Sequence, residues 1–202
     1  MKKYLRTKPI TPFMISIPHC GQHYPNDFLK YKQIDLKDLK VMEDFKSDKI
    51  IEKINKQYVD IIIAECSRTV LDLNRSKFSI DDEMYEDFEL DKPQEEKVMV
   101  KSGLGIIPKK CYEKNIFNCK LPKTYALNLI NSFYNPYHKR INENLINLKK
   151  IFGYAILIDL HSMPSLSSDK NKEFIDIVVG DNFGRSCSSD LKNFFLSFFK
   201  NQ

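Results

Sequence analysis

The stretch Gly153-Tyr-Ala-Ile-Leu-Ile-Asp-Leu-His-Ser-Met163 decides the fold. Residues 154–159 form a short apolar run that follows a glycine, and this run is the clearest strand signal in the chain. A helical spacing of apolar residues runs from 123 to about 152, and Gly153 ends that helix. Pro136 should kink or divide the helix, because proline cannot donate the backbone hydrogen bond that a helix interior requires. A strand that directly follows a long helix is the building unit of α/β folds.

Other short apolar runs predict the rest of the sheet. Residues 13–17 and 60–64 are expected as buried strands, 175–179 as a further strand, and 69–72 as a weaker candidate. Two more helices are predicted, over about 47–58 with Ser47 as its N-cap and over about 189–199. Residues 79–101 are acidic and polar and should form a surface loop. The fold class expected from this alternation is α/β, with a mixed, mostly parallel sheet flanked by helices in three layers.

Length, charge and cysteine content narrow the class of protein. With 202 residues the chain is expected to form a single domain over 1–202. No apolar run approaches the roughly 20 residues that cross a bilayer, and the apolar stretch after the basic start is too short for a secretory signal. The net charge of +5 is spread along the chain without long runs of one sign, so we expect no nucleic-acid partner. Five cysteines without a Cys-x-x-Cys pair favour reduced thiols in a cytoplasmic protein.

Two histidines directly follow predicted strands. His19 comes after 13–17, and His161 comes after 154–159. Because ligands of α/β sheets bind beyond the carboxyl ends of strands, both imidazoles can converge on one metal ion, and imidazole suits zinc. Asp159 precedes His161 by two residues and is placed to support such a site. The alternative is that each histidine hydrogen-bonds within its own polar loop. We favour the metal site because both histidines occupy equivalent strand ends.

Two of the five arginines lie close together, in Ser67-Arg-Thr-Val-Leu-Asp-Leu-Asn-Arg75. Asn74 and Arg75 can offer an amide and a guanidinium to a substrate carboxylate, and Arg68 adds a second cation. Asp72 would orient one of the arginines. Taken alone, without a partner motif, this segment would be interpreted as a salt-bridge cluster on the surface.

The ordered motifs together resemble those of the N-formylglutamate amidohydrolase family. The match runs from about residue 12 to the end, and such a series is more specific than any single motif. It comprises Ser16–Pro25 (a PHxG…P loop), Glu43–Asp48, Ser67–Arg75 (SR…DLNR), Gly103–Ile107, Tyr137-His138, Asp159–Pro164 and Asp176–Gly184.

This resemblance implies a zinc-carboxypeptidase-like fold and a zinc-dependent hydrolase that cleaves the amide of an N-acyl acidic amino acid. N-formylglutamate would yield formate and glutamate, so the partner is a small molecule. The implied metal ligands are His19, His161 and an acidic residue, either Asp44 or Asp48. The carboxypeptidases carry a glutamate at the position of Gln22, which leaves the third ligand open.

The resemblance also implies the substrate contacts and the position of the base. Arg68, Asn74 and Arg75 match the group that binds the substrate carboxylate, and His138 adds a polar contact or simply lies on a helix surface. The family's glutamate general base is expected beyond Gln202, so no catalytic base is assigned in this C-terminally short chain. The alternative function is a truncated member that binds metal or ligand with little or no catalysis.

Overall fold

The computed structural model describes residues 1–6, 8–86, 100–163 and 176–200. The chain divides into two compact units, Met1–Ser162 and Met163–Gln202. The prediction of one domain over 1–202 is not tested by this division and stays a prediction. Among the helices of the described residues, none is both long and apolar enough to span a membrane.

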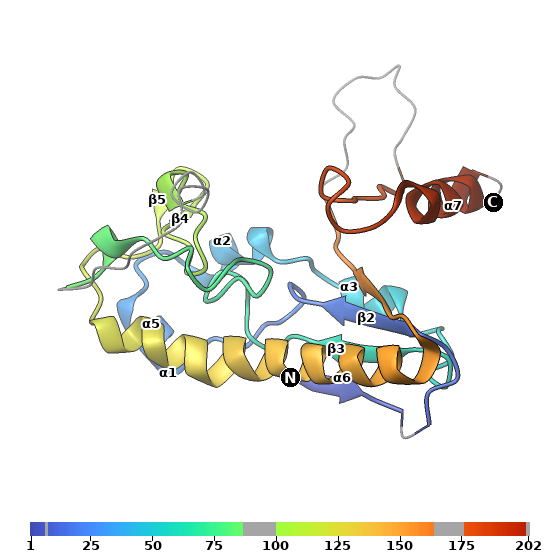
Figure 1. Cartoon of the computed structure of the whole chain (residues 1–202). Coiled ribbons are helices and arrows are strands. Elements are labelled where there is room, and N and C mark those ends of the chain that lie inside the picture. The colour runs from blue at the N-terminus through green and yellow to red at the C-terminus, as the bar shows by residue number, and fades with distance from the viewer. Residues whose placement is uncertain (7, 87–99, 164–175, 201–202) are drawn as a thin grey trace, which may run out of the picture. The chain divides into compact units, whose positions relative to one another are not determined.

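A four-stranded mixed sheet forms the centre of the first unit (Figure 1). Its strands are β1 (Lys2–Tyr4), β2 (Phe13–Ile17), β3 (Asp60–Ile63) and β6 (Ile156–Asp159), in the order β1-β3-β2-β6. Strand β2 pairs in parallel with both β3 and β6, whereas β1 pairs with β3 in the antiparallel direction. The expected α/β class with a mostly parallel sheet is therefore confirmed.

Side chains alternate between the two faces of the sheet, as the period of a strand requires. Met14 and Ile62 belong to the larger hydrophobic cluster, which includes buried residues of helix α6 (Asn135–Phe152). Ile15 and Ile61 face the opposite cluster, which includes Ile51, just after helix α3 (Ser47–Ile50). Both faces of the central strands are thus covered, so their alternating register is fixed by burial on either side.

The long helix predicted from 123 to 152 is divided by a π-helical turn. Helix α5 (Lys123–Leu129) continues into the π-helix η3 (Ile130–Tyr134) and then into α6, where Pro136 occupies the first turn. Gly153 ends the helix in the left-handed conformation, as predicted. The remaining elements of this unit are short: α1 (Asn26–Tyr31), α2 (Leu36–Leu39), η1 (Lys40–Met42), η2 (Asp82–Met84), β4 (Lys110–Cys111) and β5 (Lys114–Asn115).

One strand was missed and three local predictions were wrong. The surface loop expected over 79–101 is largely buried where it is described, since Ser79, Ile80 and Asp81 are at most 9% exposed and the helical turn η2 follows them; residues 87–99 lie outside the described residues. Strand β1 was not predicted, because Lys2–Tyr4 is exposed and carries no apolar pattern. The helix expected over 47–58 ends at Ile50, and the residues after it form turns. Residues 69–72 are a buried turn rather than a strand, since backbone N–H groups of Val70 and Leu71 bond to the Ser67 carbonyl. Apolar content alone could not separate a buried turn from a buried strand.

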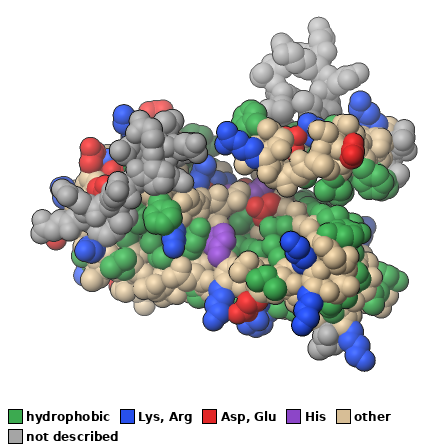
Figure 2. Space-filling view, in the orientation of Figure 1, with side chains coloured by type: hydrophobic (Ala, Val, Ile, Leu, Met, Phe, Trp, Pro, Cys, Tyr) green, Lys and Arg blue, Asp and Glu red, His purple; other side chains and the backbone are tan. Residues whose placement is uncertain are grey.

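The second unit contains helix α7 (Ser189–Lys200), confirming the predicted C-terminal helix. The strand expected at 175–179 does not form over 176–179, and residue 175 lies outside the described residues. A tight turn with left-handed backbone at Asn182, Phe183 and Gly184 follows. Lys192 of α7 pairs with Asp181 at 2.7 Å and ties this turn to the helix. On the face drawn in Figure 2, Lys and Arg side chains are scattered among other residue types.

Candidate active site

The two histidines meet because their strands are neighbours. Strands β2 and β6 are parallel, and their register pairs Ser16 with Asp159. His19 lies three residues beyond Ser16 and His161 two residues beyond Asp159, so both side chains emerge at the same carboxyl edge. Their ring centroids are 4.7 Å apart. The prediction that the two strand ends bring these imidazoles together is confirmed.

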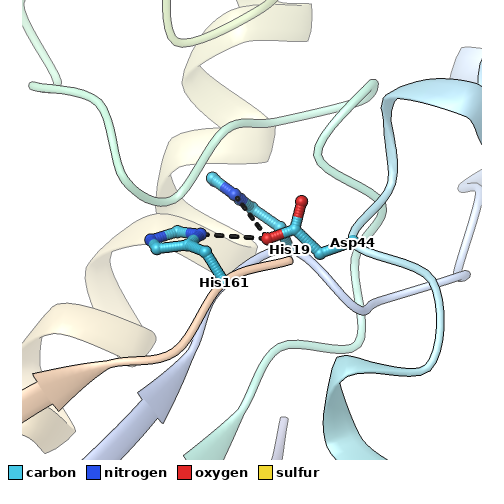
Figure 3. A group of neighbouring side chains, drawn as sticks. All are labelled: His19, Asp44 and His161. Carbon is cyan, nitrogen blue, oxygen red and sulfur yellow. Dashed lines mark hydrogen bonds and ion pairs between the residues drawn. The ribbon is translucent and has the colours of Figure 1, made fainter. Parts of the chain in front are cut away.

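Asp44 lies beside both imidazoles, and one of its carboxylate oxygens is in contact with each of them (Figure 3). Its Oδ2 atom accepts a hydrogen bond from His161 Nδ1 at 3.0 Å and lies 3.6 Å from His19 Nδ1. The backbone N–H of Ser162 donates to the same oxygen at 3.1 Å. One ligand atom from each of His19, Asp44 and His161 lies within 4.8 Å of the others, a grouping that can hold a metal ion. Of the two acidic candidates in the 43–48 segment, only Asp44 belongs to this group.

A second carboxylate, that of Asp72, bonds to the other ring nitrogen of His19. Asp72 Oδ1 lies 2.7 Å from His19 Nε2, so the ring donates its Nε2 proton there. In its neutral form the ring then presents a lone pair at Nδ1, and this atom is buried without a hydrogen-bond partner among the described residues. This lone pair faces the Asp44 carboxylate oxygen, an arrangement that a cation between them would stabilise. Two imidazoles and one carboxylate also match the donor set of a catalytic zinc site.

The pKa values at this site follow from these contacts. Burial alone would raise the pKa of Asp44, but the hydrogen bond from His161, the proximity of His19 and the hydrogen bond from the Ser162 amide lower it below its usual range. Asp72 behaves alike: burial opposes the charge, yet bonds from His19 and the Arg68 charge lower its pKa to about 2. Burial would lower the pKa of His19, whereas its two carboxylate neighbours raise it overall. Both carboxylates are therefore charged at neutral pH.

The two arginines of the SR…DLNR motif have different surroundings. Arg68 donates to Asp72 Oδ2 at 3.0 Å and to Asp44 Oδ1 at 3.4 Å, so it is held at the cluster. Arg75 is more loosely paired, with its Nε 3.7 Å from Asp72 Oδ2, and 30% of its side chain is exposed. Asn74 is exposed and its amide donates to His161 Nε2 at 3.2 Å. The motif is thus part of the histidine site rather than a separate surface cluster.

Other predicted residues lie further from the three-residue group. His138 donates from Nε2 to the Leu73 carbonyl at 2.8 Å, so it supports the loop that carries Asn74, and burial lowers its pKa. Asp159 was expected to support the metal site, but its Oδ2 is 4.0 Å from His161 Nε2, beyond hydrogen-bonding distance. Asp48 is half-buried outside the group, and Gln22 is exposed. Sequence reasoning assigned Asp72 to an arginine and missed its bond to His19.

Comparison with known proteins places these motifs in a family. The structure resembles the crystal structure of N-formylglutamate amidohydrolase from Ralstonia eutropha JMP134, with a TM-score of 0.83 and 24% sequence identity, over 99% of this chain and 72% of that one. No curated protein matches the chain. The model of the N-formylglutamate amidohydrolase family matches residues 11–202. The chain therefore belongs to the N-formylglutamate amidohydrolase family.

Proposed function

We propose that this protein is a metal-dependent hydrolase that cleaves the amide of an N-acyl acidic amino acid such as N-formylglutamate, yielding formate and glutamate. The observation that carries the proposal is the convergence of His19, Asp44 and His161 at the carboxyl edge of the sheet of an amidohydrolase-family chain. The metal we propose there is Zn²⁺, because imidazole nitrogen and carboxylate oxygen are its usual ligands at catalytic sites.

Each residue of the site has a distinct proposed role. His19, Asp44 and His161 would hold the ion, which supplies a Lewis acid that polarises the acyl carbonyl and makes water more acidic. Asp72 keeps the proton of His19 on Nε2 and leaves Nδ1 free to bind. Arg68 remains at the cluster, where its guanidinium can stabilise negative charge that develops on the carbonyl oxygen.

The substrate carboxylate is assigned to Arg75 and Asn74. Arg75 is the more exposed of the two arginines and the less firmly paired, so its guanidinium can turn to a substrate at little cost. The exposed Asn74 amide stands beside it. His138 contributes by holding the preceding residue, Leu73, through its carbonyl. No general base is assigned, because Asp44 and Asp72 already accept hydrogen bonds from imidazole and guanidinium groups.

Formate release from N-formylglutamate, measured with Zn²⁺ supplied, tests this function. We expect turnover by the wild-type chain and loss of it in His161→Ala. Arg75→Lys should raise KM more than it lowers kcat, because lysine lacks the two-pronged donor geometry. Equal background rates in wild type and His161→Ala would refute the hydrolase. Zinc bound at about one ion per chain without turnover would instead support the alternative, a family member that binds without catalysis.

A further inference from the structure

A buried polar cluster lies directly beside the site. The hydroxyl of Ser67 donates to Glu43 Oε1 at 2.7 Å, and the hydroxyl of Tyr24 donates to the same oxygen. Glu43 is only 7% exposed and Ser67 is completely buried. Burial and the bond to Glu43 raise the pKa of Tyr24 to about 12, so its hydroxyl stays a donor at neutral pH. We call these three residues, Tyr24, Glu43 and Ser67, the Glu43 clamp.

The clamp joins the chain segments that carry the site residues. Glu43 immediately precedes Asp44, and Ser67 immediately precedes Arg68. The bond from Ser67 to Glu43 therefore fixes these two segments one residue before the point where Arg68 meets Asp44. Two backbone bonds attach the same segments to the loop after β2: Asp44 N donates to the His19 carbonyl at 3.1 Å, and Ser67 N donates to the His23 carbonyl at 3.1 Å.

Stability alone does not account for a carboxylate at position 43. The second oxygen, Oε2, is buried without a hydrogen-bond partner among the described residues. An under-satisfied buried carboxylate lowers stability, and such groups in folded proteins call for another explanation. The contact that the clamp would reinforce is weak by itself, since Arg68 Nη1 is 3.4 Å from Asp44 Oδ1. Ligand geometry at a functional site must hold to about 0.5 Å, so this contact needs support.

We propose that Glu43 is a positioning residue that fixes Asp44 and Arg68 at the metal site by accepting hydrogen bonds from Ser67 and Tyr24. This inference rests on the proposed function for its consequences in catalysis. The role belongs to the accepting oxygen and not to the negative charge. A glutamine at position 43 keeps that oxygen and the length of the side chain, whereas alanine removes both.

Zinc affinity, measured by competition with a chelator, tests the clamp without depending on turnover. The variants are Ser67→Ala, Glu43→Ala and Glu43→Gln, and Tyr137→Phe is the matched control. Tyr137 makes an equally buried hydroxyl contact of 2.7 Å with Ser16, away from the clamp, so Tyr137→Phe removes a buried hydroxyl without touching Glu43. We expect Ser67→Ala and Glu43→Ala to weaken zinc binding by about 10- to 100-fold, as loss of an outer support typically does. Glu43→Gln and Tyr137→Phe should stay within about threefold of wild type.

Either of two zinc-binding results would overturn the inference. Equal losses in Ser67→Ala and Tyr137→Phe would show a merely structural effect, and a loss in Glu43→Gln as large as in Glu43→Ala would show that charge is what matters. Failure of the wild-type chain to bind zinc would refute the proposed function instead. In that case, ¹⁵N imidazole spectra of the metal-free protein, which has four histidines, test the role of the clamp. We expect Ser67→Ala, unlike Tyr137→Phe, to shift the resonance of His161 Nδ1, which bonds to Asp44, and unchanged spectra would overturn the clamp.

Discussion

Replacing Asp72 by asparagine tests how the site selects the tautomer of His19. The Asp72 carboxylate accepts the Nε2 proton of His19 at 2.7 Å and so leaves a lone pair on Nδ1. An asparagine that turns its amide toward the ring donates to Nε2 instead. The imidazole proton must then move to Nδ1, on the side that faces Asp44. Asp72→Asn is therefore expected to weaken zinc binding while changing the shape of the site very little.

The size of the effect follows from the contact that is lost. A hydrogen bond to a charged group contributes about 1.5–3 kcal/mol, and each 1.4 kcal/mol is a factor of ten in affinity. The expected loss is therefore about 10- to 100-fold, the range typical of outer-shell substitutions at metal sites. The contact is buried, with only 5% of the Asp72 side chain exposed, so screening by water does not reduce this value much.

Competition of Zn²⁺ with a chelator measures the loss, and Asp159→Asn is the matched control. Asp159 is also an aspartate beside a site histidine, but its carboxylate stands 4.0 Å from His161 Nε2. We expect Asp159→Asn to change the zinc affinity by less than about threefold, because no hydrogen bond is lost. The reasoning is refuted if the two variants weaken zinc binding equally, or if Asp159→Asn has the larger effect.

Three further predictions concern stability, each measured as the free energy of unfolding in urea. The native pKa of Asp72 is about 2, below the ordinary 3.8, so stability should fall as the pH drops from about 4 to 2, by about 2 kcal/mol from this group; Asp72→Asn should lack that part of the loss. Asp60→Ala should cost about 3–5 kcal/mol, because the buried Arg6 side chain, whose Nε lies 2.7 Å from Asp60, loses its charged partner and keeps only hydrogen bonds to the Thr11 hydroxyl and to backbone carbonyls; a loss below 1 kcal/mol would contradict this. Gly21→Ala should cost about 1–3 kcal/mol, because a Cβ there overlaps the Cys66 carbonyl, whereas Gly180→Ala has open space; equal effects of the two would argue against the clash.

The parts of the fold that the sequence predicted are those in which burial controls the pattern. Strands β2 and β3 are short apolar runs packed between two hydrophobic clusters, whereas β6 is only half-buried; each of the three was expected at nearly its observed position. Strand β1 is exposed and forms because its backbone pairs with β3, and backbone pairing leaves no mark on side-chain composition. The turn after Ser67 is buried and contains apolar residues, so its sequence resembles that of a buried strand.

The site residues divide in the same way. Some could be predicted from the neighbouring sequence, and others depend on contacts between distant segments. His19 and His161 could be identified because each directly follows a strand in the sequence. Ligands of α/β sheets generally bind beyond the carboxyl ends of strands. The choice of Asp44 over Asp48 depends on which side of a short turn faces β6, and spacing alone does not determine this. The bond of Asp72 to His19 joins residues 53 apart, and the bond of His161 to Asp44 joins residues 117 apart. Contacts of this kind arise only from the packed structure.

The site forms only where segments that are distant in the sequence pack together. The two imidazoles come together only when β6 pairs beside β2, and Asp44 reaches them only when the Asp44 amide bonds to the His19 carbonyl. No short segment carries two of the three proposed ligands, so an unfolded chain offers a metal ion only separate, weak contacts. An ion that binds the folded chain alone shifts the folding equilibrium by about 2.7 kcal/mol at a free concentration of 100 times its Kd. The sheet register that creates the site is therefore also the feature that metal binding would stabilise, which ties the function proposed for these residues to the pairing of β2 with β6.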